Sequence, residues 1–177
     1  MNLFLRLLWL KLFGRFRPRA GLLEPIRTPF RVLPTDLDVL RHVNNGVYLS
    51  LLDIARMDLL GRIGLTGPLK ERGWFPVVTA ESIGFRRSLT LLQRFEVETR
   101  ILGWDDTGFY VHQRFFRGDD AIASALVVGR FLSSVGSVPA ADVAALAGID
   151  ASPSLPDWAT RLGTDQERLR RDTIEPS

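Results

Sequence analysis

The sequence predicts a single α+β domain in which an antiparallel sheet curls around one long helix, and three patterns lead to this prediction. Residues 95–101 alternate between apolar and charged side chains, which is the period of a half-buried strand. Residues 46–63 carry Leu, Ile and Val at helical spacing, and a helix this apolar must be covered on most sides. Three further strand-like runs complete the pattern: 77–85, 109–116 and 122–132.

The other elements follow from proline, glycine and small residues. A first strand is predicted over residues 26–33, where Pro29 indicates an edge position because proline cannot donate a ladder hydrogen bond. Two of the later strands have small residues on one alternating face, which would let a helix approach closely: Ala80, Ser82 and Gly84, then Ala123, Ala125 and Gly129. Residues 140–146 and 154–171 are expected to form helices without chemistry, in a partly mobile C-terminal extension.

Composition and charge exclude several classes of protein. The 177 residues include no cysteine, so disulfides, thiolate metal sites and a cysteine nucleophile are ruled out, and two histidines make a His-rich metal site improbable. Residues 1–19 hold five of the 23 basic residues and no acidic residue, whereas the remainder has 18 basic against 20 acidic residues. The body is therefore not a basic nucleic-acid-binding domain, and no nucleic-acid partner is expected.

The leading segment differs from the rest of the chain. Residues 3–16 are apolar in almost every helical direction and would form a helix about 21 Å long, which is short for a bilayer core of about 30 Å. We expect residues 1–19 to contact a membrane surface as an interfacial anchor; the alternatives are packing on the protein's own domain or a partner, or a true span. The predicted organisation is this segment, a domain over 20–136 and an extension over 137–177. The expected location is the cytoplasm, and peripheral contact with the inner membrane face is the option that the leading segment adds.

The stretch from residue 35 to residue 48 is the part of the chain richest in chemistry. It places two carboxylates, one imidazole and two carboxamides immediately before the long helix: Asp36, Asp38, His42, Asn44 and Asn45. Either asparagine is a good N-cap, because its side-chain oxygen can accept an unpaired N–H of the first turn. The polar groups would therefore gather at a helix N-terminus, a position that attracts an anion or a polarised carbonyl oxygen.

This Asp-x-Asp-x-x-x-His-Val-Asn-Asn-x-x-Tyr motif, followed by Asp53-Ile54-Ala55-Arg56, resembles the hot-dog-fold acyl-CoA thioesterases. These include the 4-hydroxybenzoyl-CoA thioesterase type and, in particular, the thioesterase superfamily member 6 group. Residues 85–89 and 102–110 support the resemblance, which covers roughly residues 26–133. It implies a hot-dog fold, hydrolysis of an acyl-CoA or acyl-carrier-protein thioester in fatty acid metabolism, no cofactor besides the CoA of the substrate, and a homodimer or dimer of dimers with sites at the subunit boundary.

The resemblance also assigns roles to residues. Asp38 matches the loop aspartate that serves as nucleophile or general base, and Asp36 would be the outer, structural carboxylate. His42, Asn44 and Asn45 would support the reaction. The backbone amides near the helix start would polarise the carbonyl, which makes Gly46 and Val47 substrate contacts.

Other candidates remain less specific to the reaction. Tyr48 is assigned to the substrate side, although a core role is the simpler explanation, and Arg86 with Arg87 would bind CoA phosphates, although a solvated charge pair is commoner. Asp53 is a rival catalytic carboxylate whose spacing to Arg56 favours a structural ion pair. Glu81 either lines the site or faces solvent, and the sequence leaves both options open. His112 is expected to be a structural residue.

Two other functions are compatible with the same pattern. A non-catalytic acyl- or lipid-binding protein at a membrane surface would use the apolar leader and bind acyl groups without turnover. Enoyl-CoA hydratase or dehydratase chemistry uses the same fold, but with Asp-x-Asn-Pro-x-His, in which the spacing from Asp to His is five. Here the spacing from Asp38 to His42 is four, and that Asn and Pro are missing.

Overall fold

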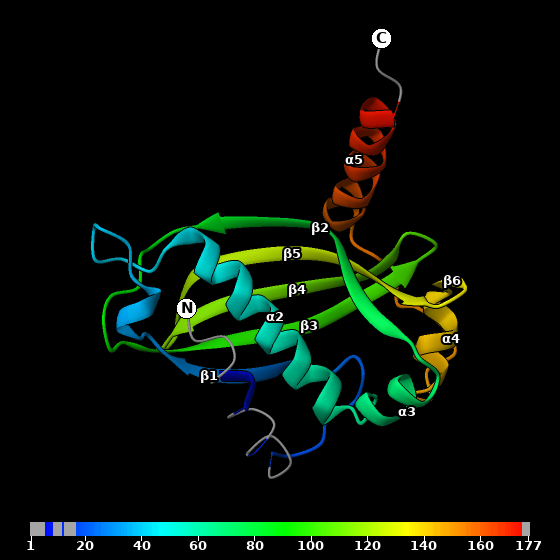
Figure 1. Cartoon of the computed structure of the whole chain (residues 1–177), viewed down its shortest axis with the longest axis horizontal. Coiled ribbons are helices and arrows are strands. Elements are labelled where there is room, and N and C mark those ends of the chain that lie inside the picture. Colours follow the sequence, from blue (N-terminus) through cyan, green and yellow to red (C-terminus); the bar gives the residue numbers. More distant parts are fainter. Residues whose placement is uncertain (1–5, 9–11, 13–16, 175–177) are drawn as a thin grey trace.

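The computed structural model describes residues 6–8, 12 and 17–174, so most of the predicted membrane anchor lies outside the described residues. One antiparallel sheet dominates the described part of the chain, with strand order β1-β3-β4-β5-β2 and β6 paired to β5 (Figure 1). Its six strands have these bounds: β1 Ile26–Arg31, β2 Phe75–Phe85, β3 Arg94–Asp105, β4 Gly108–Arg117, β5 Asp120–Ser133 and β6 Gly136–Val138. The predicted strands are confirmed, and β1, which contains Pro29, is an edge strand as expected.

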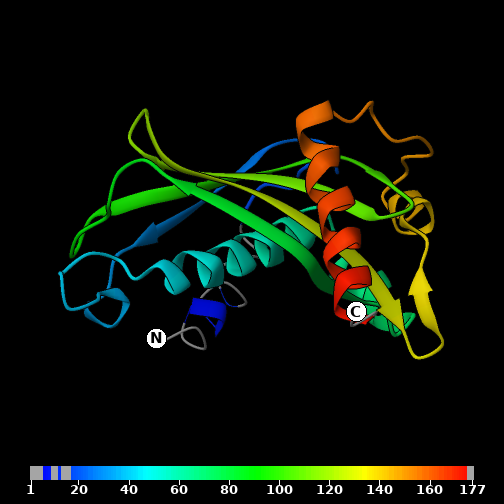
Figure 2. The same ribbon diagram turned by 90° about the horizontal axis from the view of Figure 1, so that it is seen from above.

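Helix α2 (Asn45–Arg62) lies against the concave face of this curled sheet (Figure 1, Figure 2). Its buried face packs on the inward side chains of β3, β4 and β5, among them Val97, Phe115 and Ala125. Each of these three residues is at most 2% exposed. The predicted α+β hot-dog arrangement is therefore confirmed, with the helix bounds within one residue of those expected.

A second helix covers part of the opposite face of the sheet. The first turns of α5 (Asp157–Ile174) bring Ala159 and Leu162 onto the outward-facing Tyr110, Leu126 and Val128. Figure 2 shows α5 crossing the edge formed by β2. A helix therefore does pack on the small residues of both strands, as predicted, but the two strands meet different helices. Those of β5 face α2, whereas Ala80 of β2 packs in the cluster with α5.

The chain before and after the sheet is part of the same core. Val138 of β6 and Val143 of α4 (Ala140–Ala145) pack in one cluster with Leu22 and Leu59, as does Leu69 of the unpredicted short helix α3 (Thr66–Glu71). The apolar core continues across residue 136, where the expected domain boundary was placed.

Two residues that precede β1, Arg17 and Pro18, are bound to the second half of α2. Arg17 forms an ion pair with Asp58, a buried carboxylate that also accepts a hydrogen bond of 2.7 Å from the Thr28 hydroxyl. The Arg62 Nε donates to the carbonyl oxygen of Pro18 at 2.9 Å. Among the described residues, no helix is long and apolar enough to cross a membrane.

Candidate active site

The Asp38 carboxylate lies in a tight turn that precedes α2. Its Oδ1 accepts the backbone N–H of Leu40 at 2.9 Å and that of His42 at 3.2 Å, and its own N–H donates to the His42 carbonyl at 2.8 Å. Oδ2 accepts no hydrogen bond from the residues that the structure describes. Asp38 is half-buried, so the turn orients the carboxylate with one oxygen and leaves the other oxygen available.

Asp36 has the structural role expected of the outer carboxylate. It is 1% exposed, and its Oδ2 accepts the N–H of Leu33 at 2.7 Å and pairs with the guanidinium of Arg6. Its carbonyl oxygen accepts the N–H of Asn44 at 2.9 Å. Asp36 therefore connects the leading segment, the end of β1 and the start of α2.

Asn44 is the N-cap of α2. Its side-chain oxygen accepts the N–H of Gly46 at 2.9 Å, and its carbonyl oxygen accepts the N–H of Val47 at 2.9 Å. The N–H groups of Gly46 and Val47, which were expected to polarise a substrate carbonyl, are thus both engaged by the cap. The N–H of Asn45 has no partner among the described residues, so it is the amide that can receive a ligand oxygen.

The side chains around this amide are accessible. His42 and Asn45 are exposed, and neither side chain hydrogen-bonds to another described residue. A two-residue bridge pairs His42 with Thr90, which fixes the turn against the loop between β2 and β3. The structure therefore brings Asp38, His42, Asn44 and Asn45 together at the N-terminus of α2.

Tyr48 belongs to the core beneath this site. It is 2% exposed, and its ring packs edge-on against Phe85 and Phe115, each at a centroid distance of 5.0 Å. Burial raises the pKa of the Tyr48 hydroxyl, and a hydrogen bond with the backbone of Leu89 opposes this shift. Its ring supports the start of the helix from below.

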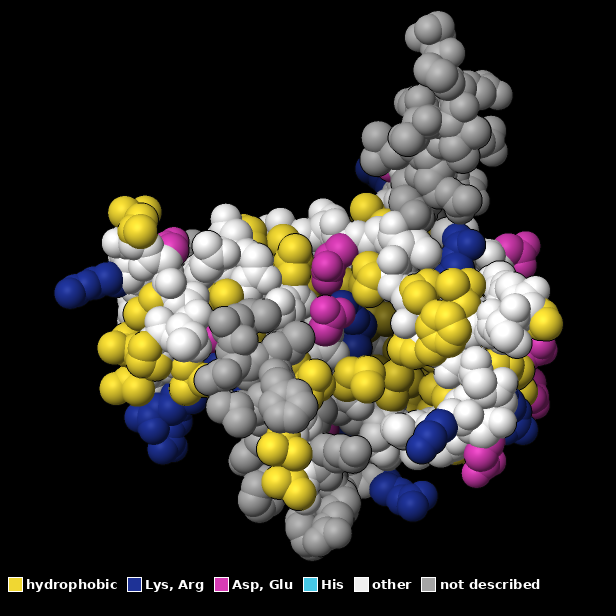
Figure 3. All heavy atoms as spheres, in the orientation of Figure 1, with side chains coloured by type: hydrophobic (Ala, Val, Ile, Leu, Met, Phe, Trp, Pro, Cys, Tyr) yellow, Lys and Arg dark blue, Asp and Glu magenta, His cyan; other side chains and the backbone are white. Residues whose placement is uncertain are grey.

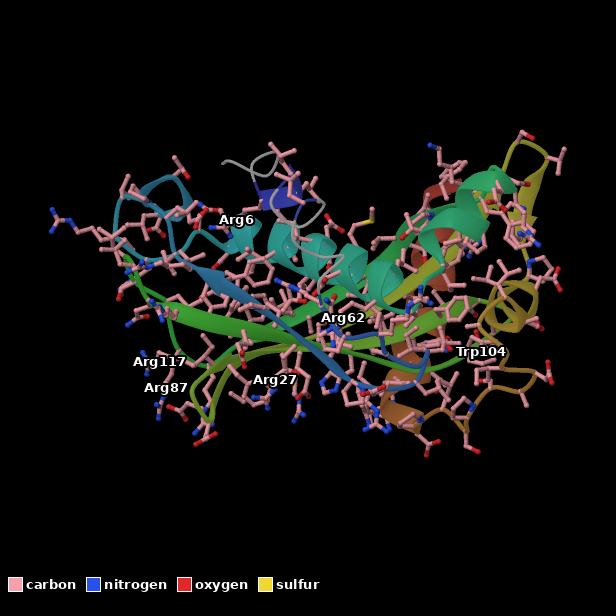
Figure 4. The ribbon with its side chains drawn as sticks, turned by 90° about the horizontal axis from the view of Figure 1, so that it is seen from below. Arg6, Arg27, Arg62, Arg87, Trp104 and Arg117 are labelled. Carbon is pink, nitrogen blue, oxygen red and sulfur yellow. The ribbon has the colours of Figure 1, made fainter. Side chains whose placement is uncertain are left out.

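The two arginines assigned to CoA phosphates are exposed after the end of β2, and their backbone N–H groups both donate to the Ile122 carbonyl. Arg87 pairs with Asp120, which also lies 4.0 Å from the guanidinium of Arg117. Figure 4 shows Arg87 and Arg117 on the side of the sheet away from α2. Arg86 has no ion-pair partner among the described residues, so of the two it has the guanidinium free for a phosphate.

A second polar cluster lies halfway along α2. Arg56 pairs with Asp53, as the spacing predicted, and also lies 3.3 Å from Glu81 on β2. Its Nη1 donates to the Oε1 of Gln113 at 2.6 Å, and the Gln113 Nε2 donates to the Leu52 carbonyl at 3.1 Å. Burial raises the pKa of Glu81, against the lowering effect of Arg56. Glu81 is therefore directed at the helix rather than at solvent.

Gln113 was not predicted as a site residue, although the sequence contains one signal for it. Gln113 occupies an inward position of β4, between the buried Val111 and Phe115, and is itself fully buried. A lone amide on an apolar strand face implies polar partners, because an unpaired buried amide is costly. These partners come from other elements, α2 and β3, which the spacing within β4 does not reveal.

Next to this cluster, a cavity of about 240 Å³ separates the second half of α2 from the sheet. Aliphatic and aromatic side chains form most of its wall, including Leu59, Ile101, Val111 and Val127, while Arg56 and Asp53 also border it. Figure 3 shows hydrophobic side chains next to acidic and basic ones over this part of the molecule. The cavity suits an apolar group of modest size. Among the described residues, no group of three His, Asp or Glu could hold a metal ion.

A curled antiparallel sheet with one long helix against its concave face is the arrangement of the hot-dog fold class. The family profile described as the Thioesterase-like superfamily matches residues 32–161, and the chain belongs to this superfamily.

The chain is also similar to two curated relatives. Protein THEM6 of Xenopus laevis is 44% identical over 99 residues, covering 56% of this chain and 48% of the relative. Protein THEM6 of Danio rerio is 40% identical over 128 residues, covering 72% and 63%, so the chain spans about half to two-thirds of these relatives.

Two solved structures share the fold. A probable thioesterase from Bartonella henselae superimposes with a TM-score of 0.61 at 22% identity, over 66% of this chain and 98% of that one. A 1,4-dihydroxy-2-naphthoyl-CoA thioesterase from Synechocystis has a TM-score of 0.62 at 15% identity, over 70% and 95%.

Proposed function

We propose that the protein hydrolyses an acyl-CoA or acyl-carrier-protein thioester, with Asp38 as nucleophile or general base. Membership of the Thioesterase-like superfamily supports thioester hydrolysis in general. The observation that carries the specific assignment is the state of the Asp38 carboxylate. One oxygen is held by the N–H groups of Leu40 and His42, and the other accepts no hydrogen bond from the described residues. A carboxylate held in this way has a fixed orientation, and its second oxygen can still contact a water or a substrate.

The chemistry requires no metal or resident cofactor. Asp38 Oδ2 would either take a proton from a water that attacks the thioester carbon or attack that carbon itself. The developing oxyanion would accept a hydrogen bond from the N–H of Asn45, at the positive end of α2. The C–S bond then breaks, and the CoA or carrier-protein thiolate leaves and takes up a proton. On the route in which Asp38 attacks directly, a water then hydrolyses the acyl–aspartyl anhydride, which releases the free acid and restores the Asp38 carboxylate. His42 and the side chain of Asn45, exposed beside the carboxylate, would orient the water or the carbonyl.

The apolar cavity behind α2 would hold the far end of the acyl group. About 16 Å of helix separates Asn45 from Arg56, given a rise of 1.5 Å per residue. An acyl chain with its carbonyl at the helix start reaches the cavity of the same chain only if it is long and extended. The cavity therefore favours long aliphatic substrates over short or compact aromatic ones.

A homodimer, or a dimer of dimers, is part of the proposal, and the free edge of β2 supports it. Among the described residues, β2 pairs only with β5, so its other edge has unpaired backbone groups over eleven residues. Phe75, Val78 and Phe85 on this strand are exposed. Pairing of two such edges would satisfy these groups and cover the apolar side chains.

The proposal is tested by thioesterase assays with acyl-CoA substrates of graded chain length. Asp38→Asn and Asp38→Ala are compared with Asp106→Asn, a carboxylate change in the distant turn between β3 and β4. We expect the Asp38 variants to lose about 100-fold or more in turnover and Asp106→Asn to lose little. Equal turnover in all three would remove the role assigned to Asp38.

The alternative is an acyl-binding protein without turnover at a membrane surface. This alternative is supported by the two hydrogen bonds of Asp38, because they also stabilise the turn. Stabilising a turn is a common structural role of aspartate, and it requires no catalysis. Saturable binding of an acyl-CoA without release of free CoA, unchanged in Asp38→Asn, would favour this alternative. The expected contact of residues 1–19 with a membrane belongs to both proposals.

A further inference from the structure

Two neighbouring turns form a protruding tip beyond the start of α2. We define the tip as residues 38–42 and 90–93. His42 is bridged to Thr90 in antiparallel fashion, and the N–H of Val43 donates to the Leu89 carbonyl at 2.9 Å. Because the pairing is antiparallel, residues 41 and 40 lie next to residues 91 and 92 as both segments leave the bridge. Both turns therefore project in the same direction.

Four aliphatic side chains occupy the ends of these turns. Val39 is 97% exposed, Leu40 71%, Leu92 54% and Leu91 46%. Figure 3 shows hydrophobic side chains, with Lys or Arg side chains beside them, at the end of the molecule where α2 begins. Neighbouring exposed aliphatic residues on one protrusion are uncommon on a protein that faces only water.

The backbone of the tip is largely satisfied by the tip itself. The N–H of Arg41 donates to the Asp38 carbonyl at 3.0 Å, and that of Leu40 donates to the Asp38 carboxylate. In the second turn the N–H of Gln93 donates to Thr90, and that of Leu92 donates to Val32 at 3.1 Å. This property matters at a lipid surface, where water is scarce and unpaired amides are costly.

The charges around the tip are positive. Arg31 and Arg94 stand directly opposite each other at the ends of β1 and β3, and Arg41 lies within the first turn. None of the three forms an ion pair with a described carboxylate. The one carboxylate of the tip is that of Asp38, and one of its two oxygens is held by the N–H groups of Leu40 and His42. Two arginines facing each other across a strand pair repel, and a bound anionic group would relieve the repulsion.

We propose that this tip inserts into the interface of an anionic lipid bilayer. The aliphatic side chains would enter the boundary between headgroups and acyl chains, and the arginines would contact the anionic headgroups. Narrow turns that project side chains suit a deformable lipid surface, whereas a stable protein interface needs a broad complementary area. The inference does not require hydrolysis, although it brings Asp38 and His42 close to the surface in which amphiphilic acyl thioesters partition.

The absence of cysteine from the 177 residues allows a direct test on the whole of this chain. Single cysteines are introduced as Leu40→Cys, Leu91→Cys and Val135→Cys, and each is labelled with an environment-sensitive fluorophore. Val135 is the matched control, because it is 96% exposed on the β5–β6 turn at the other end of the sheet. The proteins are mixed with vesicles of phosphatidylcholine alone or with phosphatidylglycerol added.

We expect labels at positions 40 and 91 to shift to shorter emission wavelengths with phosphatidylglycerol vesicles, and to be quenched by brominated lipid chains, while position 135 changes little. This readout reports insertion of the tip even if residues 1–19 also hold the protein on the vesicle. Labels at 40 and 91 that stay in water while the protein sediments with vesicles would overturn the proposal.

A second measurement separates lipid from protein partners. The double variant Leu40→Ser/Leu91→Ser should lower the vesicle partition coefficient about tenfold or more, since two leucines no longer leave water. Arg41→Gln/Arg94→Gln should remove most of the preference for phosphatidylglycerol. Unchanged partitioning in both variants, or a change of oligomeric state in the serine variant by size-exclusion chromatography, would assign the tip to a protein contact and overturn the proposal.

Discussion

The guanidinium of Arg56 lies 2.6 Å from the side-chain oxygen of the fully buried Gln113 and so ties α2 to the centre of the sheet. The Gln113 amide nitrogen completes the link by donating to the Leu52 carbonyl of the helix and, at 3.0 Å, to the Thr99 hydroxyl. This one side chain therefore joins β3, β4 and α2 within the buried layer between helix and sheet.

Removing the Gln113 amide should be costly. In Gln113→Leu the guanidinium of Arg56 and the hydroxyl of Thr99 each lose a partner where water has little access. We expect the free energy of unfolding to fall by about 2–3 kcal/mol, measured by urea titration. Thr99→Val is the graded control, because Gln113 then keeps its bonds to Leu52 and Arg56; it should cost about 1 kcal/mol. Equal stability of Gln113→Leu and wild type would show that the network contributes nothing net.

Glu81 and Glu98 should respond to pH in opposite directions. For Glu81, burial outweighs Arg56 and raises the pKa above its ordinary value of 4.5 in the folded protein. The stability that this group contributes is therefore fully present below its unfolded pKa and is lost as the pH rises through the folded pKa. Relative to Glu81→Gln, the wild type should lose stability as the pH rises above the ordinary value of 4.5 towards the raised pKa of the folded protein.

For Glu98, burial acts to raise the pKa, but hydrogen bonds from Arg114 and Arg27 hold it below 4.5. Its contribution is present above the unfolded pKa and is lost as the pH falls through the folded pKa. Urea titrations of Glu98→Gln and wild type across acidic pH should thus show the difference shrinking on acidification. The same sign of pH dependence for the Glu81 and Glu98 variants would contradict the assignments.

Asn44 and Asn45 should separate stability from turnover. Asn44 caps α2 through the N–H of Gly46, so Asn44→Ala should lower the free energy of unfolding by about 1 kcal/mol. The exposed side chain of Asn45 forms no hydrogen bond to another described residue, so Asn45→Ala should change stability by less than about 0.5 kcal/mol. If Asn45 supports the reaction, its variant loses kcat at unchanged stability. Loss of stability in Asn45→Ala, with kcat retained, would make it a structural residue.

Strands and the long helix were predictable because their patterns are local. The alternation across residues 95–101 places Val97 inward, and Val97 is fully buried in the structure. The same logic marked Ala80 as a close-approach position, but a strand pattern defines faces and not the element that covers them. The covering helix is α5, more than 70 residues later in the chain, and not α2.

The site was only partly accessible to the same reasoning. The sequence motif places Asp38 beside the helix start, yet it does not reveal which carboxylate oxygen the turn uses, since that depends on the backbone conformation at Leu40 and His42. The Arg56–Gln113 link escaped prediction because its partners are 57 positions apart, on different elements. Hydrogen bonds across a core follow from the assembled fold and not from spacing.

Filling the cavity should change which acyl chains are accepted. Val111 lines the cavity from β4, and Val111→Phe would occupy part of its 240 Å³. We expect kcat/KM for long acyl-CoA substrates to fall about tenfold or more while short substrates are unaffected, with Val111→Ile intermediate, because one to several methylenes of pocket space are lost. Initial-rate assays across chain length check this expectation. A uniform loss for all lengths would indicate general damage, and no change would remove the cavity from the site.

Docking of α5 on the sheet depends on a glycine. A Cβ at Gly163 would lie 2.5 Å from the Tyr110 hydroxyl and 3.3 Å from Thr107 Cγ2, so Gly163→Ala should displace α5 and lower the melting temperature although alanine favours helix. Gly61→Ala in α2 is the matched control, because its Cβ meets no atom within 4 Å; it should stabilise by up to about 1 kcal/mol. Fluorescence of Trp158, whose ring lies 5.4 Å from that of His112, should report undocking of α5 in the first variant alone. Stabilisation of both variants would mean that α5 is not held against Tyr110 in solution.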